Sequence, residues 1–279
     1  MKEYLKFKRS FTLIELLVVI AIIGLLSSVI LVNLSGPRQK AKITKALEFS
    51  QSVQHAIGNE AVGVWNFDDC SAKDLSGYKN DGTINGAVCV DDTPYKVVGS
   101  GQGKNALSFD GGDDYVDAGN GASLNFGTGD FTVEFWFKES VVIGWDWLLS
   151  KQKIGDLNTV FVIALHTEDN ILRVGLGPWF TDVISNQPSI SKLTWHHLIV
   201  KRGSGTVSAY IDGVIYGTSG SSSYDMNNFT GNLLIGKYST SYFNGLIDNV
   251  HIYSTALSVY EIQQHYLAGL EKHQKLTIK

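Results

Sequence analysis

The feature that most constrains this chain is a run of 19 uncharged residues, Leu16 to Leu34, that closely follows a basic segment. In a helix that rises about 1.5 Å per residue, such a run spans roughly the 30 Å of a bilayer core. Residues 1–10 hold four bases and one acid, a net +3, so the rest of a chain whose formal net charge is −4 carries −7. The positive-inside rule therefore predicts that residues 1–10 are cytoplasmic and that the chain after Leu34 lies outside.

The apolar run leads into an amphipathic helical pattern that continues to about residue 58. The two parts predict one long helix, first transmembrane and then amphipathic, with a kink at Gly36-Pro37. Glu15 is an isolated acid near the start of this helix. One interpretation is an intramembrane carboxylate with a functional partner. The other is a head-group position where the acid favours the positive end of the helix dipole.

The residues around Glu15 also resemble a known family. A basic leader, then Phe11-Thr12-Leu13-Ile14-Glu15, then an apolar stretch containing Gly24, is similar to the class III signal and N-terminal helix of type IV pilins and type II secretion pseudopilins. This resemblance implies that prepilin peptidase cuts between Ser10 and Phe11, removes leader 1–10 and methylates the Phe11 amine. It also implies that Glu15 meets the N-terminal amine of a neighbouring subunit in a filament. The family prefers Gly before the Phe, where this chain has Ser10.

Residues 59–279 differ from the N-terminal segment in sequence pattern, with many short runs of β-branched and aromatic residues between turn signals. Alternation with period two predicts half-buried antiparallel strands, and ten or more of them predict an all-β sandwich. Asp212-Gly213 predicts a tight hairpin, and Leu257 to Leu270 predict a short C-terminal helix. The predicted architecture is thus leader 1–10, helix 11–58 and β-sandwich 59–279.

The order of several short motifs resembles the laminin-G-like, concanavalin A-like lectin/glucanase superfamily. The motifs are Trp65-Asn66-Phe67-Asp68, Asp74 to Gly82, Leu107-Ser108-Phe109-Asp110-Gly111, Phe131-Thr132-Val133, Trp195-His196-His197, Tyr210-Ile211-Asp212-Gly213 and Gly245 to Val250. This resemblance implies a jelly-roll of two curved antiparallel sheets. It implies no single ligand, because the fold hosts lectins, glycosidases, adhesins and structural modules.

Two residue pairs are candidates for a catalytic centre. Glucanases of this superfamily use two carboxylates on one strand, and the nearest pair here is Glu134 and Glu139. Their odd spacing sends the two side chains to opposite faces of a strand, which argues against glycosidase activity. The tandem His196-His197 likewise fits alternate strand faces better than a metal or catalytic pair. We therefore expect that the protein is not an enzyme.

A structural calcium ion is one interpretation of the loop Asp74 to Gly82. Asp74, Ser76, Asn80 and Asp81 offer side-chain oxygens there, and the resemblance implies a ligand from the last strand at Asp248. The alternative is a set of Asx-turns that need no metal. Asp110, Asp113 and Asp114 are weaker candidates. Cys70 and Cys89 flank the loop in an extracellular domain, which predicts a disulfide.

Aromatic side chains are the candidates for carbohydrate binding. Trp145, Trp147, Trp179, Tyr224 and Tyr242 lie in or near loop-like stretches and could stack on sugars. Core packing is the expected role of Trp65, Phe109, Trp136 and Trp195, which lie in strand-like runs.

Three functions fit the sequence. The first is a pilin-like subunit that assembles with itself or related pilins through the inner-membrane pilus machinery and displays a lectin-like, adhesive domain to surface glycans. The second is a type II secretion pseudopilin, and the third is a membrane-anchored carbohydrate-binding protein that does not polymerise. The first predicts a single-pass precursor in the cytoplasmic membrane and an extracellular filament. The acidic remainder of the chain argues against a nucleic-acid partner.

Overall fold

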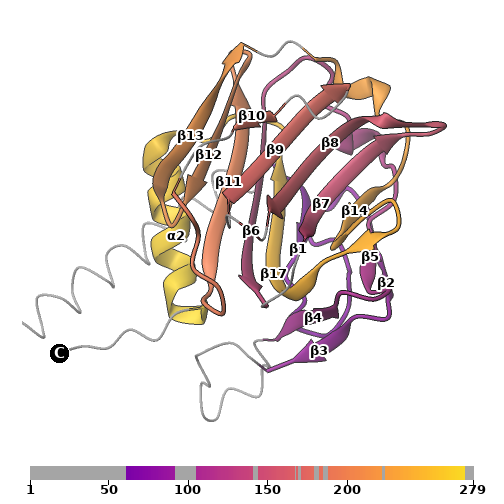
Figure 1. Cartoon of the computed structure of the whole chain (residues 1–279), viewed down its shortest axis with the longest axis vertical. Helices are drawn as coiled ribbons and strands as arrows, with labels where there is room; N and C mark the ends of the chain where they lie inside the picture. The colour runs from indigo at the N-terminus through magenta and orange to yellow at the C-terminus, as the bar shows by residue number, and fades with distance from the viewer. Residues whose placement is uncertain are drawn as a thin grey trace, which may run out of the picture. The chain divides into compact units, whose positions relative to one another are not determined.

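Strands rich in β-branched and aromatic residues form two antiparallel sheets that pack face to face in a jelly-roll-like sandwich (Figure 1). The computed structural model describes residues 61–91, 105–140, 144–166, 168, 171–178, 182–184, 188–221 and 224–273. The predicted helix 11–58, the boundary at residue 59, Ser10, Phe11, Glu15 and Trp179 lie outside these residues. Within the described ranges, no helix has the length and apolar character needed to span a bilayer.

The larger sheet has eight strands. Seven of them follow the order β13-β12-β11-β6-β17-β4-β3, and β1 pairs with β17. Their bounds are Ala61–Trp65 (β1), Val88–Val90 (β3), Ala106–Asp110 (β4), Phe131–Glu139 (β6), His196–Gly203 (β11), Thr206–Ile211 (β12), Val214–Ser221 (β13) and Asn244–Tyr253 (β17).

The smaller sheet has seven strands in the order β10-β9-β8-β7-β14-β5-β2. They are Thr83–Asn85 (β2), Tyr115–Asp117 (β5), Trp145–Lys153 (β7), Asp156–His166 (β8), Ile171–Pro178 (β9), Asp182–Ile184 (β10) and Leu233–Ile235 (β14). A separate hairpin pairs Lys237–Tyr238 (β15) with Ser241–Tyr242 (β16), and two 3-10 turns span Ala122–Leu124 (η1) and Met226–Asn228 (η2).

Strand β6 shows how alternation builds the core. Phe131, Val133, Phe135 and Phe137 are at most 1% exposed and belong to the main apolar cluster between the sheets. The residues between them face the other side of the sheet, where Trp136 packs with Trp195 and Leu246 in a second cluster. The four aromatics expected in the core, Trp65, Phe109, Trp136 and Trp195, are all buried.

The C-terminal helix α2 spans Val259–His273 and covers the face of the eight-stranded sheet that points away from the seven-stranded sheet (Figure 1). It begins two residues later than predicted because Ser258 and Glu261 form a capping box. The Ser258 amide donates to Glu261 Oε2 (2.7 Å), and the Glu261 amide donates to Ser258 Oγ (3.3 Å). The predicted short terminal helix is therefore present.

The predicted hairpin at Asp212-Gly213 joins β12 to β13. Both residues have positive φ, 52° for Asp212 and 74° for Gly213. This is the combination that a two-residue turn with the twist of flanking strands requires, and Asp and Gly are the residues that tolerate it.

Candidate functional site

Strand β7 presents two tryptophans on the outer face of the seven-stranded sheet. Trp147 packs with Val162 and Ala164 of β8 in a cluster separate from the core between the sheets. The ring of Trp145 stacks on that of Trp147, with centroids 5.4 Å apart and planes 18° apart. Trp145 remains 41% exposed, whereas Trp147 is 8% exposed. The outer ring is therefore open to a ligand and is held in place by the inner one.

Two more rings extend this pair into what we call the aromatic row: His166, Trp145, Trp147 and Tyr238. His166 of β8 meets Trp145 edge-on at 4.7 Å between centroids. Tyr238 of β15 lies 4.6 Å from Trp147. Ser150 Oγ donates to the Lys237 carbonyl (2.6 Å) and so fixes the β15-β16 hairpin against β7. The row is thus built on strands β7, β8 and β15.

A second aromatic group lies on the same hairpin and on β5. The rings of Tyr115 and Tyr242 are 6.3 Å apart, and Lys237 Nζ lies 3.8 Å and 4.9 Å from their centroids. An ammonium over tyrosine rings is a cation–π arrangement. This second group offers flat apolar surface and a positive charge together, which is a chemistry suited to a polar ligand with apolar faces.

The structure separates four of the five aromatics proposed for carbohydrate binding, and the fifth, Trp179, lies outside the described residues. It brings Trp145 and Trp147 together on a strand, and Tyr242 lies in the second group. Tyr224 instead stacks on the buried Phe229 and packs against the core. Sequence reasoning missed His166, Tyr238, Tyr115 and Lys237. The alternation of "WDWLLS" could have put Trp145 and Trp147 on one face, but their partners on other strands give no local signal.

Between the two tryptophans, Asp146 points the opposite way, into the sandwich, where it meets Glu139 from the end of β6. The two residues are 2% and 1% exposed. Burial, and next the charge of Glu139, raise the pKa of Asp146 to about 7. Burial also raises the pKa of Glu139, although Lys192 Nζ lies 3.8 Å from its Oε1. Sequence reasoning missed this carboxyl pair, which joins the two sheets.

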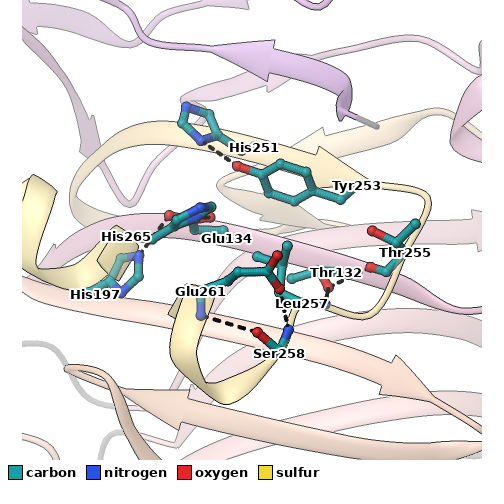
Figure 2. Close-up of polar contacts among 10 residues, drawn as sticks. All are labelled: Thr132, Glu134, His197, His251, Tyr253, Thr255, Leu257, Ser258, Glu261 and His265. Carbon is teal, nitrogen blue, oxygen red and sulfur yellow. Dashed lines mark hydrogen bonds and ion pairs between the residues drawn. The ribbon is translucent and has the colours of Figure 1, made fainter. Parts of the chain in front are cut away.

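Glu134 lies on the other face of β6, as the odd spacing predicts, and is buried beneath α2 (Figure 2). Its Oε1 is 2.9 Å from His197 Nε2 and its Oε2 is 2.7 Å from His265 Nδ1. Burial raises the pKa of Glu134, but the charge of His265 and the two hydrogen bonds outweigh it and hold the pKa well below the usual value. Glu134 and Glu139 therefore do not share one cleft.

The tandem histidines also face opposite sides of β11. His197 contacts Glu134, whereas His196 Nδ1 is 2.8 Å from Asp212 Oδ2 and its Nε2 is 2.7 Å from Ser191 Oγ. Ser, His and Asp in this order are the constellation of serine hydrolases. Here His196 Nε2 also lies 3.1 Å from the Ser191 carbonyl. Because a carbonyl can only accept a hydrogen bond, Nε2 donates to it, whereas in serine hydrolases this nitrogen takes a proton from the serine. His196 thus links the segment before β11 to the β12–β13 turn.

In the loop Asp74 to Gly82, the Asp74 carboxylate accepts four hydrogen bonds. Val64 N and Ser76 N donate to Oδ1 (3.0 and 2.8 Å), and Ser76 Oγ and Asn80 N donate to Oδ2 (2.8 and 2.9 Å). These four bonds fill the lone-pair sites of the carboxylate. Asp81 Oδ1 accepts the Asp74 amide (2.9 Å). This arrangement favours the Asx-turn interpretation over a calcium ligand.

The ligand expected from the last strand, Asp248, is fully buried on β17, where its Oδ1 accepts the Asn249 amide (2.8 Å). Its carboxylate does not form a metal-like cluster with those of Asp74 and Asp81. The one group of three carboxylates within 4.8 Å of one another in the described part of the chain is Asp110, Asp113 and Asp114, two of them exposed. A disulfide joins Cys70 and Cys89 beside the loop.

Comparison with known families supports both family resemblances, that of the N-terminal segment and that of the β-sandwich. The model of the prokaryotic N-terminal methylation motif matches residues 5–31. The model of the concanavalin A-like lectin/glucanases superfamily matches residues 110–263, more than half of the chain. Comparison with curated proteins gives no match.

Several solved structures share the fold at low identity. Domain 4 of AbnA, an extracellular arabinanase from Geobacillus stearothermophilus in complex with arabinotriose, is 20% identical with a TM-score of 0.58, over 75% of this chain and 98% of that chain. Trypanosoma rangeli sialidase is 14% identical with a TM-score of 0.59, over 84% of this chain and 40% of that one. The binding domain of Paraclostridial Mosquitocidal Protein 1 is 17% identical with a TM-score of 0.54, over 75% and 52%. The chain thus spans about half or less of the sialidase and toxin chains.

Proposed function

The chain belongs to the concanavalin A-like lectin/glucanase superfamily and carries a prokaryotic N-terminal methylation motif, and from this premise we propose that it is a type IV pilin-like subunit whose β-sandwich binds carbohydrate. The observation that carries the proposal is the joining of these two parts in one chain. A methylation motif belongs to a membrane-anchored precursor that is processed for assembly, and the sandwich is then the part that a filament displays.

Processing and assembly are the first half of the proposal. Prepilin peptidase cuts between Ser10 and Phe11, and the Phe11 amine is methylated. The Glu15 carboxylate then pairs with the Phe11 amine of a neighbouring subunit, which compensates a charge that would be costly alone in an apolar helix bundle. Other copies of the chain, or related pilins, are the partners, together with the inner-membrane pilus machinery.

Carbohydrate binding is the second half, and the aromatic row is the proposed site. Trp145 offers an exposed ring to the apolar face of a sugar, and Lys237 offers a positive charge over the rings of the second aromatic group. A structure of the same fold, domain 4 of AbnA, holds arabinotriose, so arabino-oligosaccharides are among the first ligands to test. No residue of the row acts as a nucleophile or general acid in this proposal.

Electron microscopy of cells with an antibody against the sandwich tests assembly. We expect labelled surface filaments. Label confined to the cell envelope, without filaments, would favour a secretion pseudopilin or an anchored protein that does not polymerise.

Binding is tested on immobilised oligosaccharides with the full chain in mild detergent. Trp145→Ala should weaken binding by about tenfold or more, equivalent to about 1.4 kcal/mol, because it removes the open ring. Tyr260→Ala is the matched control, since Tyr260 is an exposed aromatic (54%) on α2, away from the row. Equal loss in both variants, or in neither, would contradict the assignment of the site.

A further inference from the structure

The carboxyl groups of Glu139, from the larger sheet, and Asp146, from the smaller sheet, face each other, and both residues are buried. Backbone hydrogen bonds hold them in place. The Glu139 carbonyl accepts the Leu193 amide (2.9 Å), and the Asn244 amide donates to Asp146 Oδ1 (3.3 Å). The Ser140 amide, next to Glu139, donates to the Asn244 carbonyl (3.0 Å). Three segments of the chain therefore keep the two acids together.

The two side chains share a proton. A carboxylate can only accept a hydrogen bond, so the side-chain hydrogen bond between Glu139 and Asp146 needs a proton on one of them. Apart from that bond, neither oxygen of Glu139 nor Oδ2 of Asp146 has a hydrogen-bond partner within the described structure. Lys192 Nζ lies 3.8 Å from Glu139 Oε1 and supplies one positive charge. One proton and one ammonium thus neutralise the two carboxyl groups.

The proton is held most weakly near neutral pH. Burial raises the pKa of both acids, and with the charge of Glu139 as the next cause it raises that of Asp146 to about 7. Lys192, from the segment before β11, and the more weakly acting His196 of β11 oppose this effect at Glu139. The Asn244 amide, at the start of β17, is neutral. When the proton leaves, the pair therefore keeps one negative charge that Lys192 does not balance.

An unbalanced buried charge is costly, and the start of β7 is where the fold can yield to it. Asp146 is the second residue of β7, between Trp145 and Trp147, and strand ends open more readily than strand centres. We propose that the proton shared by Glu139 and Asp146 is a pH switch for the aromatic row. With the proton, the two tryptophans stay stacked on the sheet; without it, the start of β7 loosens and the stack is lost.

The switch rests on the proposed function only for its effect on carbohydrate binding, because the aromatic row is the proposed site. We expect the full chain to bind immobilised arabino-oligosaccharides at least about threefold more weakly at about pH 8.5 than at about pH 5.5. Asp146→Asn should bind equally well at both pH values. Its side-chain amide donates the hydrogen bond that the shared proton makes, and it cannot lose that donor by titration.

The decisive test follows the stacked rings without any ligand. Near-ultraviolet circular dichroism of the full chain in mild detergent is recorded from about pH 5.5 to about pH 8.5, and the difference from Trp145→Phe isolates the signal of the stack. In the unmodified chain we expect this signal to fall by about half or more, with a midpoint at about pH 7. In Asp146→Asn and in Glu139→Gln it should stay constant. Both variants keep the side-chain shape, and far-ultraviolet circular dichroism checks their folding.

Two further variants are matched controls that should keep the transition. Asp114→Asn removes another buried acid whose pKa burial raises, directly before β5, a strand that does not pair with β7. His166→Gln removes the imidazole that meets Trp145 edge-on and can itself change charge near neutral pH.

Three results would overturn the switch: a constant signal in the unmodified chain, an unchanged transition in both amide variants of the pair, or loss of the transition in either control. A transition that depends on the pair, in a chain that binds no arabino-oligosaccharide at any pH, would support the switch and contradict the carbohydrate proposal for this ligand.

Discussion

At the scale of single residues, Asp74 shows how one side chain organises a loop. Its carboxylate accepts bonds from β1 and from Ser76 and Asn80 of its own loop, and it is 6% exposed. Removing it leaves the backbone amides of Val64, Ser76 and Asn80, in a partly buried region, without this acceptor. Each unsatisfied buried group costs about 1 to 3 kcal/mol, so these hydrogen bonds make Asp74 a strong contributor to stability.

We predict that Asp74→Ala lowers the free energy of unfolding by about 2 to 4 kcal/mol in urea denaturation. Asp113→Ala serves as the control, because Asp113 is exposed and should change stability by no more than about 0.5 kcal/mol. If calcium raised the free energy of unfolding of the unmodified chain but not that of Asp74→Asn, the Asx-turn interpretation would be wrong. The loop Asp74 to Gly82 would then be a calcium site, as the alternative interpretation predicts.

At the scale of elements, helix α2 docks through buried polar groups as well as apolar packing (Figure 2). Thr132 Oγ1 donates to the Thr255 carbonyl (2.7 Å) and accepts the Leu257 amide (3.0 Å), which fixes the segment before the helix. His265 reaches Glu134 from the helix itself. Burial lowers the pKa of His265, but the Glu134 carboxylate outweighs it and raises the pKa above the usual value.

The docking of α2 should therefore depend on pH. Because the pKa of His265 is raised by folding, its protonated form stabilises the fold fully below about pH 6.5, and this stabilisation is lost as the pH rises through the folded pKa. The pKa of Glu134 is lowered by folding, so its contribution is present above about pH 4.5 and is lost as the pH falls through the folded pKa. The pair contributes most between these two limits.

We predict that His265→Gln destabilises the protein more at about pH 6 than at about pH 9. Urea unfolding at both pH values measures the difference. The neighbouring titratable groups are His197, His251, Tyr253 and Glu261. His166→Gln is the control, because His166 packs against Trp145 on the seven-stranded sheet, away from α2. An equal loss of stability at the two pH values would show that His265 contributes only by packing.

At the scale of the whole molecule, the N-terminal segment and the sandwich have separate tasks in the proposed function. The segment anchors and assembles, and the sandwich binds. A substitution in one part should therefore leave the other part unchanged. Glu15 lies in the first part and Trp145 in the second.

We predict that Glu15→Ala abolishes surface filaments while oligosaccharide binding by the purified chain persists. Intact-mass measurement accompanies this test, and a mature chain that begins with methyl-Phe11 is expected. Filaments of normal number in Glu15→Ala would contradict the assembly contact, and a chain that retains Met1 would contradict cleavage after Ser10. Ser10→Gly, which restores the residue preferred by the pilin family, is the matched control for processing.

Sequence by itself determined the elements and the family. Period-two alternation separated Glu134 from Glu139, since successive side chains on a strand point to opposite faces. Asp212-Gly213 determined the hairpin, and Ser258 and Glu261 determined the start of α2, because turns and caps are local chemistry. The order of short motifs indicated the superfamily.

Only the tertiary structure decided which distant residues meet. The aromatic row joins β7, β8 and β15, the Glu139 and Asp146 pair joins two sheets, and Glu134 meets a histidine 131 residues later in the chain. The burial that shifts the pKa values of these acids likewise arises only when the sheets and α2 pack. Such contacts follow from register and from which face each strand turns inward. The residues next to a given residue in the sequence do not indicate which side chains pack against it from the opposite sheet.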